Sequence, residues 1–412
     1  MLPRLAESRF KRLISAFPVV VVAGARQVGK TTLINAALGP EWTTITLDPT
    51  IDVAGARKDP DLLLANHRGS LCVDEVQYAP ELVAAIKRSV DLDRRPGRFV
   101  LSGSQHWNVL RSLAESLAGR AVFLDLNGFT LQERAGRGHG ATWLSKWLTH
   151  PHADTLFGLG RIDSGRTLNE LLFRGVLPEA NTLDVDLLAD FFAGYRRTYI
   201  ERDVRLLGGV SDAQLFGRFL GLAGALSAQE VNSAHLGREL GLSPATATRW
   251  LGLLEGSYQW FEIPAFSRNV VKRASGRTRG FVADTGLACA TQLLPVPDSL
   301  DAWPRRGALF ETAVVADIRA QCQLISPSPN LWHWRLHSGA EVDLVLEWNG
   351  TLYPIEIKLR SHPDKLDARG IRAMVASLPE ERFAPGLIVG PIDRVSAVAE
   401  GVYALPWDAC PR

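Results

Sequence analysis

The sequence has few cysteines, no long apolar run and almost no net charge. Its four cysteines, Cys72, Cys289, Cys322 and Cys410, are scattered and form no Cys-x-x-Cys pair. This argues against a zinc site and a disulfide framework. The apolar run FPVVVVAG at residues 17–24 is far shorter than a membrane span, and no signal-type cleavage site follows it. These absences predict a cytoplasmic protein that does not enter a membrane.

The composition is that of a soluble globular protein with more than one domain. A chain of 412 residues is too long for one ordinary core, which predicts about two to four domains. The formal charge of +2 points to no class of partner. A nucleic-acid surface would have to come from local clustering of basic residues.

The first 130 residues or so alternate strand-like and helix-like segments. A β-branched run, PVVVVA at residues 18–23, is followed at once by the helical pattern TTLINAAL. Further apolar runs lie at 43–47, 70–73, 98–102 and 121–126. Alternating strands and helices predict the α/β class, with a parallel sheet in this part of the chain.

A phosphate-binding loop is the strongest motif. GARQVGKT at residues 24–31 fits G-x-x-x-x-G-K-[ST] between a predicted strand and a predicted helix. Lys30 would reach the β- and γ-phosphates, and the Thr31 hydroxyl would ligate Mg²⁺. The predicted nucleotide-binding residues are Gly24, Ala25, Arg26, Gln27, Val28, Gly29, Lys30, Thr31 and Thr32.

Later strand ends supply the other expected parts of an ATPase site. SLCVDEVQ at residues 70–77 ends in acid, so that Asp74 would hold Mg²⁺ through water and Glu75 would polarise the attacking water. Ser102 or Ser104, after the next strand, could sense the γ-phosphate, or could simply end the strand. Arg120 could neutralise phosphate charge in cis or in trans, or be an ordinary surface arginine.

At this point the chain resembles a known family. GARQVGKTTL, LCVDEVQYAPEL, VLSGSQ and SLAGRAVFLDL are similar to the prokaryotic AAA-type predicted ATPases that carry a C-terminal domain of unknown function. YRRTYIERDV, FSRNVVKR, FVADTGLA and LFETAVVADI resemble that C-terminal domain, so the resemblance covers nearly the whole chain. It implies a P-loop core that uses ATP and Mg²⁺, a helical section, a winged helix and a restriction-endonuclease-like end.

The expected boundaries follow the changes in pattern. They are an ATPase domain at 1–134, an insertion and helical region at 135–225, a winged-helix-like domain at 226–290 and a restriction-endonuclease-like domain at 291–412. The Gly- and His-containing stretch at about 135–165 departs from the family pattern. We interpret it as a solvated insertion or linker, because His139, His150 and His152 have no carboxylate or thiol partners at ligand spacing.

SAHLGREL, GLS and PATATRWLGLLE predict a helix–turn–helix, with Ser243 as N-cap and Pro244 at the first position of the second helix. The helical period assigns Ala247, Trp250, Leu251 and Leu254 to the core and leaves Thr246, Thr248 and Arg249 free to meet a groove. The following basic run contains Arg268, Lys272, Arg273, Arg277 and Arg279. It could contact DNA phosphates, or the unit could serve packing and subunit contacts instead.

LEWNGTLYPIEIKLR at residues 346–360 contains the strongest short hairpin signal, Asn349-Gly350. A two-residue turn there pairs Trp348 with Thr351, and counting back places Asp343 opposite Glu356 and Glu341 opposite Lys358. Alternation then directs Val342, Leu344, Ile355, Ile357 and Leu359 to the other face of the sheet.

Two directly opposed carboxylates repel unless a cation lies between them. We therefore expect Asp343 and Glu356 to hold a second Mg²⁺, with Lys358 steadying the attacking hydroxide or the phosphate charge and Glu311 completing the site. This resembles the restriction-endonuclease-like pattern of Asp on one strand and Glu-x-Lys on the next. The alternatives are a surface Glu341–Lys358 pair beside solvated carboxylates, and the same geometry without activity.

The sequence thus predicts a Mg²⁺-dependent ATPase whose nucleotide state controls a C-terminal module acting on nucleic acid. One alternative is an ATP-gated DNA nuclease using Asp343, Glu356 and Lys358. Another is a nucleotide-switched regulator that binds DNA or protein and has an inert C-terminal fold. ATP is the expected ligand, DNA is a candidate partner, and self-association into a homo-oligomer is left open.

Overall fold

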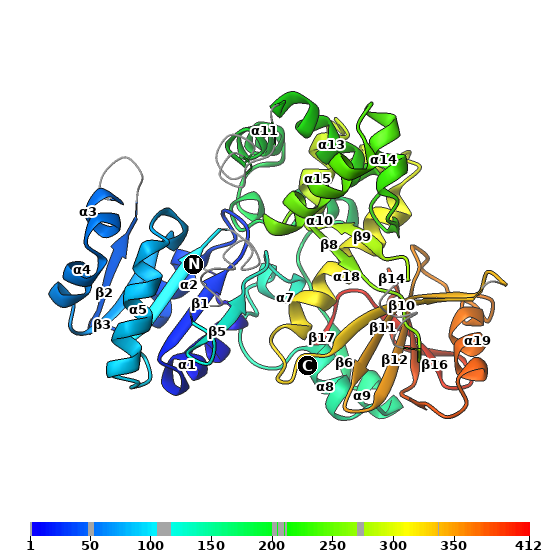
Figure 1. The fold of residues 1–412 in the computed structure, drawn as a ribbon. Helices are drawn as coiled ribbons and strands as arrows, with labels where there is room; N and C mark the ends of the chain where they lie inside the picture. The colour runs from blue at the N-terminus through cyan, green and yellow to red at the C-terminus, as the bar shows by residue number, and fades with distance from the viewer. Residues whose placement is uncertain are drawn as a thin grey trace.

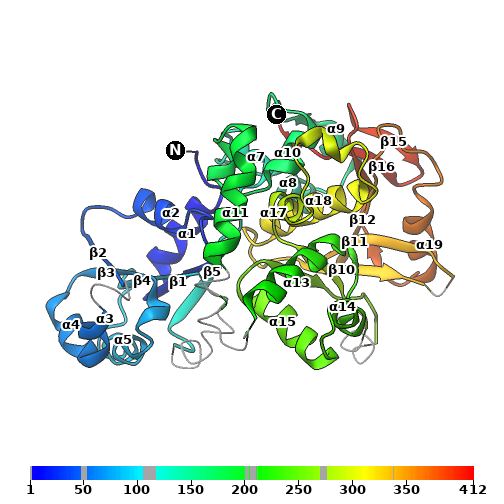
Figure 2. The same ribbon diagram turned by 90° about the horizontal axis from the view of Figure 1, so that it is seen from above.

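The computed structural model describes residues 2–47, 53–104, 117–199, 204, 210, 212–269, 276–336 and 338–412. Figures 1 and 2 show an N-terminal α/β unit on one side of the molecule and the remaining helices and sheets packed together on the other. Within the described residues, no helix is both long enough and apolar enough to cross a bilayer.

Five parallel strands form the N-terminal sheet in the order β2-β3-β4-β1-β5. Strands β1 (Val19–Ala23) and β4 (Phe99–Gly103) are buried along their whole length, as is usual for parallel strands covered on both faces. The other elements are α1 (Ala6–Ala16), α2 (Lys30–Ala37), β2 (Trp42–Thr46), α3 (Val53–Lys58), α4 (Pro60–Asn66), β3 (Ser70–Asp74), α5 (Glu81–Leu92) and β5 (Ala121–Asp125). The predicted parallel α/β fold is confirmed here.

The stretch predicted as a solvated insertion or linker is instead packed structure. It contains α8 (Trp143–Thr149), α9 (Ala153–Phe157) and β6 (Leu159–Arg161), and β6 pairs with β17 (Ala409–Pro411) near the C-terminus. Trp147 is fully buried, and its ring meets that of Tyr353 edge-on at a centroid distance of 5.0 Å. The hydrophobic periodicity of this stretch is weak because its short helices and strand pack onto the core of the C-terminal sheet and do not form a separate core.

Helices dominate the next part of the chain, within the region at 135–225 where a helical section was expected. The helices after the packed stretch are α10 (Leu168–Arg174), α11 (Leu188–Thr198) and α13 (Ala213–Ala225), with short 3-10 turns at Glu179–Asn181 and Val185–Leu187. One further short helix, α7 (Leu131–Arg134), precedes that stretch. Residues 200–203, part of the segment YRRTYIERDV, lie outside the described residues.

A helix–turn–helix follows at the predicted place. Helices α14 (Ser233–Glu239) and α15 (Pro244–Gly256) flank the turn, and the Ser243 hydroxyl accepts a hydrogen bond from the Thr246 amide at 3.1 Å. The predicted core residues Ala247, Trp250, Leu251 and Leu254 are buried, whereas Thr248 and Arg249 are exposed. Beside the helices, β7 (Gln229–Glu230), β9 (Arg279–Val282) and β8 (Trp260–Ile263) form a small sheet. Residues 213–282 are called the helix–turn–helix unit below.

The C-terminal sheet has seven strands, in the order β10-β11-β12-β14-β16-β15, with β13 beside β12. Helices α18 (Arg306–Cys322) and α19 (Arg369–Ser377) belong to this part, and α17 (Thr285–Thr291) leads into it. The strands are β10 (Asn330–Arg335), β11 (Glu341–Trp348), β12 (Thr351–Ile357), β13 (Arg382–Phe383), β14 (Gly386–Gly390), β15 (Ser396–Ala399) and β16 (Val402–Pro406).

The β11–β12 hairpin has the predicted register. Trp348 pairs with Thr351 and Leu344 with Ile355, and both turn residues have positive φ, 48° at Asn349 and 73° at Gly350, as a type I′ turn requires. Counting on from Leu344 and Ile355 brings Asp343 to the level of Glu356.

One predicted side-chain direction in this hairpin is wrong. On the other side of β11, Val345 pairs with Trp332 and Val342 with Trp334, so two residues of β11 lie opposite the single residue His333. This β-bulge turns Val342 into the same core cluster as Val345, while Leu344 packs in the other cluster with Ile355. Asp343 is one of the two bulged residues.

Candidate functional site

The phosphate-binding loop lies between β1 and α2, at the carboxyl edge of the N-terminal sheet. Gly29 precedes α2 with φ of 90°, a conformation that favours glycine. Gly24 lies so close to the segment that follows β5 that an added Cβ would stand 2.2 Å from the Leu126 carbonyl oxygen. The two glycines of the motif are therefore required by the backbone path of the loop.

The two side chains at the start of α2 point back into this loop. The buried Lys30 Nζ donates to the carbonyl oxygens of Gly24 and Ala25 at 3.0 and 2.9 Å. The Thr31 hydroxyl donates to Asp74 Oδ2 at 2.9 Å. Lys30, Thr31 and the acid of β3 thus lie together, as the motif predicted.

Asp74 and Glu75 occupy the adjoining end of β3. Ser102, at the end of β4, donates its hydroxyl proton to Asp74 Oδ1, so the two strand ends are joined. Glu75 has a left-handed backbone with φ of 59° and accepts a hydrogen bond from the side chain of Gln77. Gln77 also donates to the Ser104 hydroxyl at 3.2 Å.

Gln77 is a site residue that the sequence interpretation missed. It holds the carboxylate of Glu75, the residue assigned to polarise the attacking water. Its only signal in the sequence is its position two residues after Glu75.

The donors present at the loop fit the Mg²⁺–nucleotide complex that the motif implies. A hydroxyl and a carboxylate, from Thr31 and Asp74, face each other at hydrogen-bond distance, and hard oxygen donors of this kind suit Mg²⁺. Lys30 Nζ donates to two neutral carbonyl oxygens of the loop, which the oxygens of an entering phosphate would replace.

A cavity of about 400 Å³ adjoins the loop on the side of α2. Its lining is contributed by the N-terminal segment, the phosphate-binding loop, the first turn of α2 and later segments, and includes Leu2, Pro3, Arg4, Gly29, Thr32, Phe129, His139, Pro178 and Thr182. Its volume lies within the ordinary range for pockets that hold small ligands.

Arg4 is the second site residue that the sequence interpretation missed. Its guanidinium donates to the carbonyl oxygens of Val28 and Asn127, each at 2.7 Å, and pairs with Glu133 at 3.0 Å. It therefore ties the phosphate-binding loop to the segment after β5. No motif marks it, because its partners come from distant parts of the chain.

Arg120 is not brought to the phosphate-binding loop. It precedes β5, whose first residue Ala121 pairs with Val19 at the far edge of the sheet, about 13 Å along the strand from the loop edge. Its guanidinium donates to both carboxylate oxygens of Asp91, at 2.7 and 2.9 Å. A role in cis is wrong for this conformation, so only contact with a neighbouring subunit's nucleotide would give Arg120 the predicted role.

The acidic site of the C-terminal sheet assembles the predicted side chains. Asp343 and Glu356 are both buried, and Lys358 Nζ lies 2.5 Å from Glu356 Oε1 and 3.7 Å from Asp343 Oδ2. Asp343 Oδ2 also accepts a hydrogen bond from the Ile357 amide at 2.9 Å. The alternative of solvated carboxylates beside a Glu341–Lys358 pair is wrong, because Lys358 instead contacts the two buried acids.

A fifth side chain, Arg279 of β9, enters this site from the helix–turn–helix unit. Its Nη1 lies 3.0 Å from Asp343 Oδ1, and its Nη2 lies 2.7 Å from Glu311 Oε1. The same Nη2 donates to the Ala228 carbonyl oxygen at 2.8 Å. Two of the predicted carboxylates, Asp343 and Glu311, thus share a cation, and that cation is a guanidinium.

Burial and repulsion among the acids shift their protonation. Burial first, and then the charge of Asp343, raise the pKa of Glu356 to about 8, although Lys358 opposes the rise. The same two causes raise the pKa of Glu311 well above its usual value. Burial lowers the pKa of Lys358, but Asp343 and Glu356 outweigh burial and raise it. The carboxylates are therefore costly to ionise together without a cation.

The carboxylates of Asp343, Glu356 and Glu311 are the kind of oxygen ligand that a divalent cation prefers. In this conformation they are not arranged around a free position for one. Across the described parts of the chain, no group of three or more His, Cys, Asp or Glu side chains is arranged to hold a metal ion. However, Glu356 Oε2 is a buried atom without a hydrogen-bond partner among the described residues, and Asp343 and Glu311 already share one cation. A metal would need the place that Arg279 fills.

The described arginines of the basic run after α15 form ion pairs within the molecule. Arg268 pairs with Glu380 and Glu381 at 3.0 and 2.9 Å, and Arg277 with Glu230 at 3.2 Å. Arg279 lies within the acidic site, so the expectation that its charge faces DNA is wrong. Arg268 and Arg277 keep exposed side chains, and their contact with DNA stays a prediction. The other two predicted basic residues, Lys272 and Arg273, lie outside the described residues.

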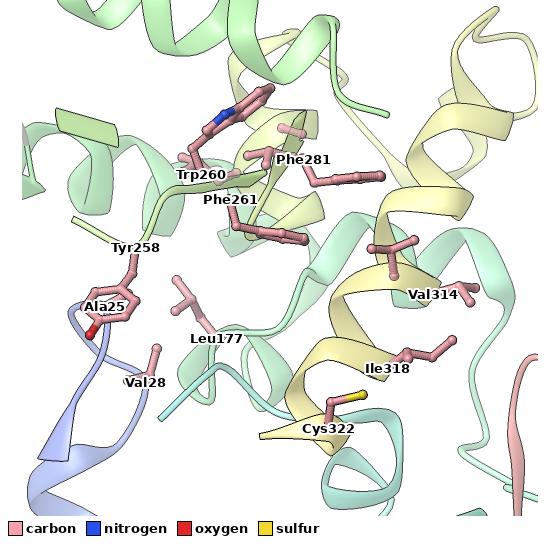
Figure 3. Packing of buried hydrophobic residues seen from close by; sticks show 14 of the residues in the cluster. Ala25, Val28, Leu177, Tyr258, Trp260, Phe261, Phe281, Val314, Ile318 and Cys322 are labelled. Carbon is pink, nitrogen blue, oxygen red and sulfur yellow. The ribbon is translucent and has the colours of Figure 1, made fainter. Parts of the chain in front are cut away.

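The helix–turn–helix unit also touches the ATPase loop. Figure 3 shows the Tyr258 ring beside Ala25 of the loop, and the Tyr258 hydroxyl donates to Asp125 Oδ1 at 2.8 Å. Arg319 of α18 stacks over Phe261 at 4.5 Å and donates to Asn127 Oδ1 at 3.0 Å. The unit therefore contacts both candidate sites.

Three family descriptions match successive parts of the chain. The loop, acidic strand end and parallel sheet together define an ATPase-type nucleotide-binding domain, and an AAA domain matches residues 16–135. A domain of unknown function (DUF8612) matches 165–298, and a domain of unknown function (DUF4143) matches 306–410.

Two curated relatives extend over the whole chain. These are the uncharacterized protein Rv2008c of Mycobacterium tuberculosis and the uncharacterized protein Mb2031c of Mycobacterium bovis. Each is 30% identical over 409 residues, which is 98% of this chain and 83% of the relative. The chain belongs to their family, the AAA-type ATPases with a C-terminal domain of unknown function.

Solved structures match only weakly. A STAND-type signal transduction ATPase of Pyrococcus horikoshii with a tetratricopeptide repeat sensor is 10% identical, with a TM-score of 0.23, and the match covers 75% of this chain and 44% of that one. Protein VC1899 of Vibrio cholerae is 13% identical, with a TM-score of 0.19, over 95% and 94% of the two chains. Scores this low carry no argument about function.

Proposed function

We propose that the protein is a Mg²⁺-dependent ATPase whose nucleotide state controls metal-dependent cleavage of nucleic acid at the acidic site. The observation that carries the nuclease part is the burial of Asp343 and Glu356 together with Lys358 on adjacent strands. The winged-helix-like order of helices and strands between the two sites provides the link between them.

ATP binding is supported by the loop geometry. Lys30 would exchange its two carbonyl partners for phosphate oxygens, and the amides at the start of α2 would meet the phosphates. The adjoining cavity of about 400 Å³ would accept the nucleoside. Bound Mg²⁺ would neutralise phosphate charge between Thr31 and Asp74.

Hydrolysis needs a group that orients water. Glu75 lies at the same strand end as Asp74, and Gln77 holds one of its carboxylate oxygens. We assign Glu75 to accept the proton of the attacking water and Gln77 to position it.

The acidic site would act on a phosphodiester. A divalent cation there supplies a polarised water and neutralises charge on the phosphate. Asp343, Glu356 and Glu311 would hold the cation. Lys358, which lies beside Glu356 and Asp343, would stabilise the negative charge that develops on the phosphate.

A second candidate is a nucleotide-switched regulator with an inert C-terminal fold. The observation in its favour is Arg279, which pairs with Asp343 and Glu311 in this conformation. In that case the acids would serve only to dock the helix–turn–helix unit.

One cleavage assay separates the two candidates. Single- and double-stranded DNA and RNA are incubated with wild type, Asp343→Asn and Lys30→Ala, with Mg²⁺ or Mn²⁺, with and without ATP. We expect wild type to cleave with ATP, Asp343→Asn to lose cleavage while keeping ATP hydrolysis, and Lys30→Ala to lose both. Intact substrates in every wild-type reaction would contradict the nuclease and favour the regulator.

A further inference from the structure

Arg279 reaches the acidic site from a different unit of the molecule. Asp343 and Glu356 come from β11 and β12 and Glu311 from α18, whereas Arg279 begins β9 of the helix–turn–helix unit. Its side chain is only 13% exposed, as is that of Glu311, and that of Asp343 is 5% exposed. Charges so far from water interact strongly, and each depends on the other for compensation.

The guanidinium occupies the position of a shared cation. One terminal nitrogen lies 3.0 Å from Asp343 and the other 2.7 Å from Glu311. A divalent cation bound by the same two carboxylates would compete for those oxygens, and the positive charges of metal and arginine would repel each other. Arginine and metal therefore cannot both hold these acids.

We propose that Arg279 is an internal occupant of the metal position, which keeps the acidic site closed until β9 withdraws. This rests on the proposed function only in taking the acidic cluster as a metal site. It adds how the site is regulated: by a strand of the helix–turn–helix unit that carries its own cation in place of the metal.

The surroundings of β9 suit a part that moves as one piece. Arg279 is anchored through the Ala228 carbonyl oxygen, beside β7 of its own unit. Next to it, Glu230 of β7 pairs with both Arg277 and Arg335, at 3.2 and 3.0 Å. Of these partners only Arg335 belongs to the C-terminal sheet. Withdrawal of β7 and β9 together breaks the Arg279 pairs, the Glu230–Arg335 pair and the hydrogen bond between His333 Nε2 and the Arg277 carbonyl oxygen at 2.9 Å. It also uncovers Phe281 of β9, which is buried in the main core cluster.

The test is Mn²⁺ binding by the nucleotide-free, full-length protein, followed by electron paramagnetic resonance and by thermal unfolding. Wild type is compared with Arg279→Gln and with Arg277→Gln, a matched control on the exposed neighbouring arginine. We expect Arg279→Gln to bind Mn²⁺ about tenfold more tightly or better, since a site closed most of the time has its affinity reduced by the open fraction. Arg277→Gln should behave as wild type.

A double variant shows where the metal binds. Arg279→Gln with Asp343→Asn should lose the gained Mn²⁺ affinity and the gained Mn²⁺-dependent thermal stabilisation. If the glutamine variant does not fold, Arg279→Lys is measured in its place, because a lysine keeps one charge but cannot bridge Asp343 and Glu311 with two nitrogens. Its Mn²⁺ affinity should lie above that of wild type.

Equal Mn²⁺ affinity in wild type and in the folded Arg279 variants would overturn the proposal and leave Arg279 as a structural partner of the acids. Failure of the proposed function gives a different result. Tight Mn²⁺ binding by Arg279→Gln without cleavage of any nucleic acid would retain the internal occupant and reject the nuclease. Equal cleavage by wild type and Arg279→Gln in the absence of ATP would retain the nuclease and reject the internal occupant.

Discussion

The phosphate-binding loop and the acidic site each contain a buried cation, but the partners of the two cations differ. Lys30 is held by two neutral carbonyl oxygens, whereas Arg279 is held by the carboxylates of Asp343 and Glu311. A phosphate can draw Lys30 from these two oxygens, since neither of them carries a net charge that would be left uncompensated. Only another cation can replace Arg279 without leaving buried acids uncompensated. The first site is ready for its ligand, and the second must be opened.

Lys30→Ala gives the largest expected effect and sharpens this contrast. ATP affinity should fall by on the order of 100-fold or more, because charge-assisted contacts to phosphate contribute up to about 3 kcal/mol. Nucleotide binding is measured by calorimetry, with Lys11→Ala, an exposed lysine paired with Glu7, as control. The Mn²⁺ affinity of the acidic site should stay unchanged, and undiminished ATP binding would remove Lys30 from the phosphate role.

Glu75→Gln should separate binding from turnover at the loop. The amide cannot accept a proton from water, so steady-state hydrolysis should slow by on the order of 1000-fold while ATP is retained. Glu81→Gln, at the start of α5 and exposed, is the control. Normal turnover in Glu75→Gln would exclude Glu75 as the group that orients the attacking water.

Asp317→Asn tests the part of α18 that joins the two regions. Asp317 Oδ1 accepts a hydrogen bond from the Leu131 amide at 2.7 Å, and burial raises the pKa of Asp317 from 3.8 to about 6. The folded protein therefore binds this proton more tightly than the unfolded chain. The resulting stability is fully present below pH 3.8 and is lost as the pH rises through about 6.

The asparagine variant lacks this proton and should lose the pH dependence. The difference in unfolding free energy between wild type and variant should change by about 2 kcal/mol between pH 4 and pH 7, to the disadvantage of wild type at the higher pH. Urea unfolding across this range measures it, with Asp301→Asn at an exposed ion pair as control. Parallel curves for wild type and Asp317→Asn would show that Asp317 is ionised throughout.

Tyr258→Phe gives the smallest effect on stability and tests the link between the regions. The change removes the hydrogen bond to Asp125, which contributes about 1 kcal/mol, and keeps the ring against the loop. ATP affinity should stay close to that of wild type, but ATP should no longer change Mn²⁺ binding or cleavage at the acidic site. An intact response to ATP would place the link elsewhere.

The part of each site that can be predicted from the sequence depends on how close together its residues lie along the chain. The loop is contiguous, so Gly24 to Thr32 form a pattern that one stretch of chain shows by itself. Asp343 and Glu356 could be paired because Asn349-Gly350 fixes the hairpin register. The α/β fold and the buried face of α15 follow from periodicity in the same way.

The residues that were missed have partners far away in the chain. Arg279 lies 64 positions from Asp343, within a basic run that suggested DNA contact, and Arg4 lies 129 positions from Glu133. Trp143 and Trp147 were assigned to a linker because their short helix completes the core of a distant sheet. The bulge that turns Val342 depends on the neighbouring strand β10, which the hairpin alone does not specify.

Cleavage by Arg279→Gln in the absence of ATP is the most direct test of a metal-dependent site that is closed by an arginine and opened by nucleotide. We expect this variant, given Mn²⁺ alone, to cleave the substrate that wild type cleaves with ATP, and at a comparable rate. The Arg279→Gln, Asp343→Asn double variant should be inactive. An Arg279→Gln protein that folds and yet needs ATP as wild type does, or cleaves no better than the double variant, would contradict the account.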